Sequence, residues 1–105
     1  MTFRIATLLV ALCMSASART AEYEIGQKGK KFSQKELTVK VGDTVSFKND
    51  DPFFHNIFSL SDTKTFDLGS FPQGQSKKVT FDKAGTVEVE CAIHPEMKVT
   101  IEVKK

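Results

Sequence analysis

The chain alternates apolar and polar residues over short runs, and this two-residue period restricts its fold more than any other feature. Successive side chains of a β-strand point to opposite faces, so such runs predict strands that are buried on one face. Gly42-Asp43 and Lys83-Ala84-Gly85 are turn signals between runs. The runs predict strands at 23–25, 37–41, 44–49, 57–58, 77–82, 86–90 and 97–103.

Between these runs the composition is typical of loops. We expect loops at residues 49–52 (Asn-Asp-Asp-Pro) and over the polar residues 59–64. No segment shows the 3.6-residue period of a helix longer than about ten residues. The sequence therefore predicts an all-β fold, an antiparallel sandwich or barrel with one solvated face on each sheet. A length of 105 residues leaves room for one small domain.

The N-terminal segment has the composition of a targeting signal. Residues 1–4 include Arg4, residues 5–14 are apolar apart from one threonine, and Ala16-Ser17-Ala18 supplies a small-residue end. This order is typical of a secretory signal peptide, and the apolar run is shorter than the roughly 20 residues that span a bilayer. We predict a signal peptide at 1–18 and a mature domain at 19–105, periplasmic or otherwise exported. A buried N-terminal helix is the alternative, but it leaves the Ala-x-Ala end unexplained.

The mature chain carries little net charge. The net charge of +2 falls to about +1 once Arg4 is removed. Nucleic-acid binding needs a strongly basic face, so no nucleic-acid partner is expected. No second apolar run could cross a membrane, and a lipid anchor at Cys13 is disfavoured because Leu12 stands where such a signal has a small residue. The clustered lysines Lys28, Lys30 and Lys31 are interpreted as a solvated turn rather than a binding patch.

The mature chain contains a small set of soft and imidazole side chains. Cys91 is its single cysteine, and a lone cysteine in an exported protein implies an intermolecular bridge, a reactive thiol or a metal ligand. His94 and Met97 follow it within one short loop, and His55 lies well upstream. Two imidazoles, a thiolate and a weak axial thioether form the electron-transfer site that copper prefers. The predicted ligands of one copper ion are therefore His55, Cys91, His94 and Met97.

Each of these residues also has an ordinary interpretation. A single histidine is commonly a loop residue, a free cysteine a small buried hydrophobe, and a methionine core filling. Zinc would accept the cysteine and the two histidines with Met97 unused. The absence of any other Cys, His or Met from residues 19–105 favours the copper site.

The ligand motif resembles that of a known family. Cys91-Ala92-Ile93-His94-Pro95-Glu96-Met97 has a Cys-x-x-His-x-x-Met spacing, preceded upstream by His55-Asn56 and by residues 41–49. With these motifs the chain resembles the cupredoxins, the type 1 blue copper proteins. The ligand loop looks most like that of amicyanin, and those of pseudoazurin and plastocyanin are similar but longer in places. The resemblance covers residues 23–103 in outline. It implies a Greek-key β-sandwich in which Asn56 links the two ligand-bearing loops.

The resemblance also implies the function. A cupredoxin cycles copper between Cu(I) and Cu(II) and carries single electrons between redox proteins such as a cytochrome, dehydrogenase or oxidase. Four protein donors leave no open position for a substrate, so an enzyme is not expected. We expect a monomer in which backbone N–H groups near Asn56 hydrogen bond the Cys91 sulfur and tune the potential. A copper carrier or buffer that uses the same ligands is the alternative.

Partner docking depends on the residues around the second histidine. Cupredoxins dock through an apolar patch there, although Glu96 stands where the family tends to be apolar. Phe53 and Phe54 either pack in the ordinary way or join Pro52, Ile93 and Pro95 in such a patch. Because adjacent strand residues face opposite ways, one of the two phenylalanines is expected to face outward.

Overall fold

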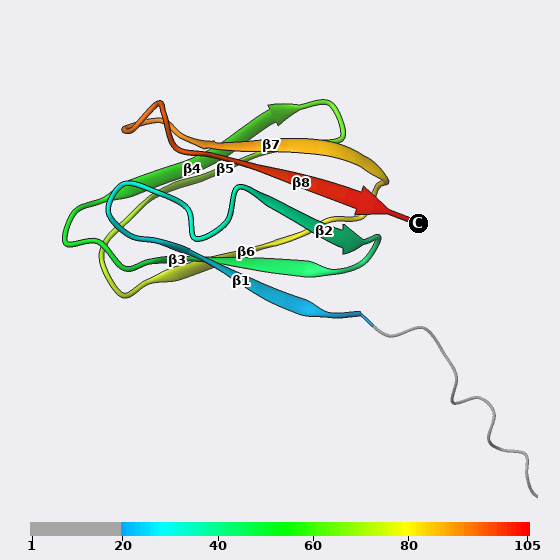
Figure 1. Ribbon diagram of the computed structural model, residues 1–105, viewed down its shortest axis with the longest axis horizontal. Coiled ribbons are helices and arrows are strands. Elements are labelled where there is room, and N and C mark those ends of the chain that lie inside the picture. Colours follow the sequence, from blue (N-terminus) through cyan, green and yellow to red (C-terminus); the bar gives the residue numbers. More distant parts are fainter. Residues whose placement is uncertain (1–19) are drawn as a thin grey trace, which may run out of the picture.

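Two β-sheets packed face to face form the protein, as the computed structural model of residues 20–105 shows (Figure 1). The strands of this range are β1 (Glu22–Gln27), β2 (Glu36–Lys40), β3 (Thr44–Asn49), β4 (His55–Ser61), β5 (Lys64–Phe71), β6 (Ser76–Thr80), β7 (Gly85–Cys91) and β8 (Lys98–Lys104). No helix occurs within residues 20–105. The predicted signal peptide at 1–18 lies outside the described residues, so it and the boundary at residue 19 stay predictions.

The sheets have different sizes. One has three strands in the order β1-β3-β6, and the other has five in the order β2-β8-β7-β4-β5. The predicted sandwich is confirmed, and most neighbouring strands are antiparallel. However, β1 runs parallel to β3, and β2 runs parallel to β8. β1 and β2 follow each other in the chain but lie in different sheets. Neither strand is joined to its sheet neighbour by a hairpin, so each can pair in parallel.

The inner faces of the sheets carry the alternating apolar residues that the sequence singled out. Fully or almost fully buried residues include Val45, Phe47, Val79, Phe81, Val87, Val89, Val99, Ile101 and Val103. The expected inward face of residues 37–41 is only partly correct. Val39 is buried, but Leu37 is half-buried and Val41 is 41% exposed. The reason is that β2 is an edge strand and ends at Lys40, before Val41.

The prediction of a loop at residues 59–64 is wrong, because these residues belong to a β-hairpin. β4 continues to Ser61, and β5 begins at Lys64 and pairs antiparallel with it. β5 is an edge strand whose Phe66 and Leu68 pack against the core only partly. Leu60 is 75% exposed, so this hairpin lacks the strong apolar alternation that marks the inner strands.

Asp43 holds the turn between β2 and β3 to the start of β1. Its two carboxylate oxygens accept hydrogen bonds from the backbone N–H groups of Ala21 and Lys40, each at 2.8 Å. The side chain is buried, so these bonds replace the water that the carboxylate loses. The bond from Lys40, followed by that from Ala21, holds the pKa of Asp43 below its usual range.

We expect this interaction to make stability depend on acid pH. A carboxyl group with a lower pKa in the folded state stabilises the fold above its unfolded pKa of about 3.9 and loses that contribution as pH falls through the folded value. The urea midpoint of Asp43→Asn should therefore be lower at pH 7, and the difference from wild type should shrink below about pH 4. Asp62→Asn, at an exposed site, is the matched control. A constant difference at all pH values would contradict the assignment.

Candidate metal centre

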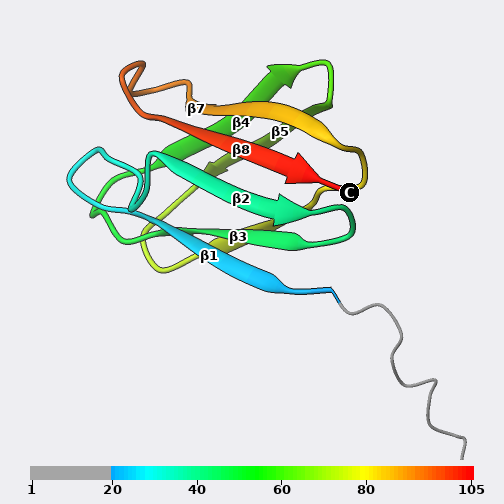
Figure 2. The same ribbon diagram turned by 45° about the vertical axis from the view of Figure 1, so that its right-hand side comes forward.

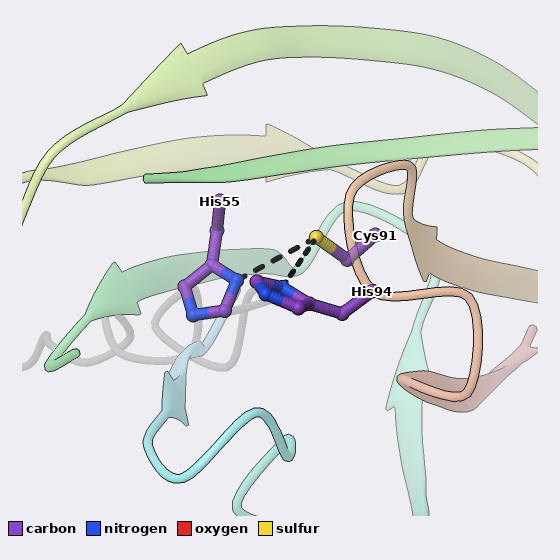
Figure 3. A group of neighbouring side chains, drawn as sticks. All are labelled: His55, Cys91 and His94. Atoms are coloured by element: carbon purple, nitrogen blue, oxygen red, sulfur yellow. Dashed lines mark hydrogen bonds between the residues drawn. The ribbon is translucent and has the colours of Figure 1, made fainter. Parts of the chain in front are cut away.

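Three donor side chains from two separate parts of the chain point toward one another (Figure 3). His55 begins β4, Cys91 ends β7, and His94 lies in the loop before β8. β4 and β7 are antiparallel neighbours in which Ile57 pairs with Cys91, so His55 starts just beyond the end of β7. The Cys91 Sγ lies 3.5 Å from His55 Nδ1 and 3.7 Å from His94 Nδ1.

These separations fit the donors of a bound metal. Bonds of about 2.0 Å to nitrogen and about 2.3 Å to sulfur, at tetrahedral or trigonal angles, leave the two atoms roughly 3.5–3.7 Å apart. The donor atoms of the three residues all lie within 4.8 Å of one another. The sequence prediction of a shared site for His55, Cys91 and His94 therefore agrees with their placement.

Burial divides the cluster into an inner and an outer side. His55 and Cys91 are buried, whereas His94 is half-buried. The Phe53 ring lies 5.5 Å from the His55 ring and 5.3 Å from the His94 ring, measured between centroids. Phe53 thus packs against both histidines, while Phe54 is 54% exposed, which confirms that one of the pair faces outward.

The loop that leads to His55 is organised by Asn49, the last residue of β3. The buried Asn49 amide donates to the carbonyls of Phe53 (2.7 Å) and Phe71 (3.0 Å). Its Oδ1 accepts the backbone N–H of Asp51 at 2.8 Å. The residues predicted as a loop from composition therefore have a conformation fixed by a fully bonded side chain.

Asp51 fixes the orientation of the His55 ring. The His55 Nε2 lies 2.8 Å from Asp51 Oδ2, and an ionised carboxylate only accepts, so Nε2–H is the donor. In the neutral imidazole the opposite nitrogen, Nδ1, is then the lone-pair atom, and it faces the Cys91 sulfur. Carboxylate partners of this kind orient metal-binding histidines and raise their basicity.

The Asp51 carboxylate is itself held by the connection between β1 and β2. The backbone N–H groups of Gly29 and Lys30 donate to it at 2.7 and 3.1 Å. Burial by itself would raise the pKa of Asp51, but the bonds from His55, Gly29 and Lys30 outweigh it and hold that pKa below its usual range. The sequence did not single out Asp51, because four-residue spacing implies contact in a helix but not in a loop.

The main chain of Asn56 joins the two ligand-bearing segments. Its N–H donates to the Cys91 sulfur at 3.5 Å, and its carbonyl accepts from Ala92 N–H at 2.9 Å. Both expectations for Asn56, a link between the loops and a donor to the sulfur, are thereby confirmed. The link uses the backbone, since the buried side-chain Oδ1 has no partner among the described residues.

Met97, the fourth predicted ligand, is buried at the end of the ligand loop. Its exposed fraction is 2%, and its N–H donates to the carbonyl of His94 at 2.9 Å. This turn leads directly into β8, one residue later than predicted. Its role as an axial donor stays a prediction.

A sequence model of the copper-binding proteins of the plastocyanin/azurin family matches residues 19–104. The chain belongs to this family. It is also similar to the methylamine utilization protein MauL of Methylorubrum extorquens, with 29% identity over 95% of this chain and 91% of that protein.

Solved structures of copper proteins share the fold. A Cu(I) amicyanin variant has 27% identity and a TM-score of 0.72, with 77% of this chain and 80% of that chain covered. The purple cupredoxin from Nitrosopumilus maritimus has 26% identity and a TM-score of 0.69, covering 77% and 98% of the two chains. A copper-containing nitrite reductase from Thermus scotoductus has 29% identity and a TM-score of 0.72, but 78% of this chain spans just 22% of that protein.

Family membership and the donor set together identify copper as the metal. An imidazole, a thiolate and a second imidazole suit both oxidation states of copper. The cluster of His55, Cys91 and His94 provides this set with suitable spacing.

We expect Asp51 to tune the copper potential. Asp51→Asn removes a negative charge next to His55, which should disfavour Cu(II) and raise the reduction potential by about 60 mV, a tenfold change in equilibrium for one electron. Protein-film voltammetry of the copper-loaded protein measures this shift. Asp50→Asn removes a partly exposed carboxylate one residue away and should leave the potential nearly unchanged. Equal shifts in the two variants would show that only the overall charge matters.

Proposed function

We propose that this chain is an exported, mononuclear type 1 copper protein that carries single electrons between redox proteins. The observation that carries the proposal is the cluster of His55, Cys91 and His94, whose donor atoms face one another at distances suited to a metal. Membership of the copper-binding family and likeness to amicyanin support it.

The donors are positioned by the fold itself. Bound copper would supply the one-electron step between Cu(II) and Cu(I), held by His55, Cys91 and His94 with Met97 as the fourth donor. Asp51 orients His55, and the Asn56 N–H donates to the Cys91 sulfur. Because these contacts are made by the protein itself, they would hold the ligands in place and limit rearrangement when an electron arrives or leaves.

Electrons would pass through His94, the most accessible of the three donors. Ile93 (49% exposed) directly precedes His94 in the chain, and Phe54 (54% exposed) follows Phe53, whose ring packs against His94. With the exposed Pro52 and Pro95 they supply the residues of the apolar docking patch that the sequence suggested. A redox protein seated there would lie close to the His94 ring.

The alternative functions have less support. A copper carrier needs to release its metal, but His55 and Cys91 are buried, and residues 19–105 hold no methionine or histidine beyond the four candidate ligands. An enzyme would need an open coordination position, which four protein donors do not leave. Within residues 20–105 no helix is long and apolar enough to cross a membrane. Export rests on the predicted signal peptide at 1–18.

The colour of the copper-loaded protein tests the proposal. The mature protein, residues 19–105, should show an intense blue band with Cu(II) that a mild reductant bleaches reversibly. Cys91→Ser should abolish the band, because the thiolate–copper bond produces it. Ser59→Ala, a buried hydroxyl away from the donors, should keep it. A colourless wild-type protein that still binds metal would point instead to zinc or to a copper carrier.

The role of Met97 has its own test. Met97→Leu keeps the volume nearly constant, so the fold should be retained at a cost below about 1.5 kcal/mol. The blue band should persist, since Cys91 is unchanged. The potential should rise, because losing a lone-pair donor disfavours the more highly charged Cu(II), and the axial ligand tunes such potentials. An unaltered potential in voltammetry would show that Met97 is core filling.

A further inference from the structure

A pocket with a volume of about 440 Å³ lies between the β1–β2 connection and the ligand loop. Both segments are at the same end of the sandwich, away from the C-terminus (Figures 1 and 2). Four exposed lysines line it, and we call it the lysine pocket after Lys30, Lys31, Lys35 and Lys98. Phe32 and Met97 are apolar residues that also line the pocket.

The pocket concentrates positive charge in a chain that has little overall. Glu96 is its single acidic lining residue. Lys48, Lys64 and Lys78 form ion pairs elsewhere, whereas none of the four pocket lysines pairs with a carboxylate within residues 20–105. Since the whole mature chain is nearly neutral, any attraction of anions would come from this local excess rather than from the net charge.

The wall of the pocket contacts the copper site by two routes. Met97, the proposed axial donor, lines the pocket directly. Lys30 donates its backbone N–H to Asp51, the partner of His55, and its ammonium lies 5.8 Å from the centre of the Phe53 ring. Phe53 in turn packs against His94. A group bound in the pocket would therefore touch Lys30 and Met97. Lys30 contacts Asp51 and Phe53, which in turn contact the donor histidines.

We propose that the lysine pocket docks a carboxylate-rich surface of the protein partner that exchanges electrons through His94. This inference rests on the proposed function and names the chemistry of the partner. The ammonium groups would pair with Asp and Glu side chains of the partner, while the apolar residues near His94 make the adjoining contact. Charge pairs at the rim of an interface chiefly raise the association rate and fix orientation, and their effect falls with salt.

The first experiment measures binding without electron transfer. The diamagnetic Cu(I) protein, labelled with 15N, is titrated with poly-L-glutamate at low ionic strength. Amide shift changes should concentrate at residues 28–35 and 96–98 and should weaken at least severalfold in Lys31→Gln/Lys35→Gln. The control, Lys83→Gln/Lys104→Gln, changes net charge equally at exposed sites outside the pocket and should bind like wild type.

Two outcomes of this titration would overturn the proposal. Equal weakening in both double variants would mean that net charge alone attracts the polymer. Equal shifts with inorganic phosphate at the same concentration of charge would mean that the pocket takes small anions rather than a protein surface. The same titration can be run on zinc-substituted protein, which should give the same result, so a failure of the copper assignment would leave this test intact.

The second experiment measures electron transfer. Stopped-flow oxidation of the Cu(I) protein by ferricyanide, a multivalent anion, should slow by about three- to tenfold in Lys31→Gln/Lys35→Gln at low ionic strength. Oxidation by a cationic cobalt(III) phenanthroline complex should not slow. The blue band reports whether the copper site survives in each variant. Equal slowing with both oxidants would place the effect at the copper site and contradict a docking role.

Discussion

The backbone pairing of β4 with β7 is the contact on which the metal site depends. Ile57 and Cys91 are partners across these strands, so the start of one strand lies beside the end of the other. His55 and Cys91, which are far apart in the sequence, thereby meet inside the molecule. β7 continues into the ligand loop and returns as β8, its other neighbour, which brings His94 to the same place. The sheet order thus brings the three donors of the cluster together.

Buried polar side chains then give the cluster its exact orientation. The Asn49 side chain donates to two carbonyls and accepts from one N–H. The Asp51 carboxylate accepts hydrogen bonds from the His55 ring and from two backbone N–H groups. A buried polar group without partners costs free energy, so fully bonded groups favour a single loop conformation. Gln27 is a contrast, since both polar atoms of its buried side chain lack partners among the described residues. Nothing in the structure explains its presence.

Much of the fold and of the site was predictable because the signals are local. Two-residue alternation identified strands whose inner faces are fully buried, such as those carrying Val45 and Val87. The rarity of Cys, His and Met singled out His55, Cys91 and His94, whose donor atoms lie together in the structure, without any knowledge of distances. The sequence did not predict the β4–β5 hairpin, because its edge strand is only half-buried and lacks a clear apolar alternation. The role of Asp51 was not predicted, because its contact with His55 depends on a loop conformation that Asn49 determines. No periodic pattern in the sequence encodes such a contact.

The lysine pocket also could not be predicted from the sequence, because its residues come together only in the fold. In the sequence, Lys30 and Lys31 form part of a short polar turn, and Lys98 is a single charge at the start of the last strand. The parallel pairing of β2 with β8 joins them, since the Thr100 N–H donates to the Lys35 carbonyl at 3.0 Å and so places the start of β2 beside the ligand loop. Charges that repel one another are thereby gathered next to Met97. Such a concentration opposes folding slightly, and a negatively charged partner surface would relieve it on binding.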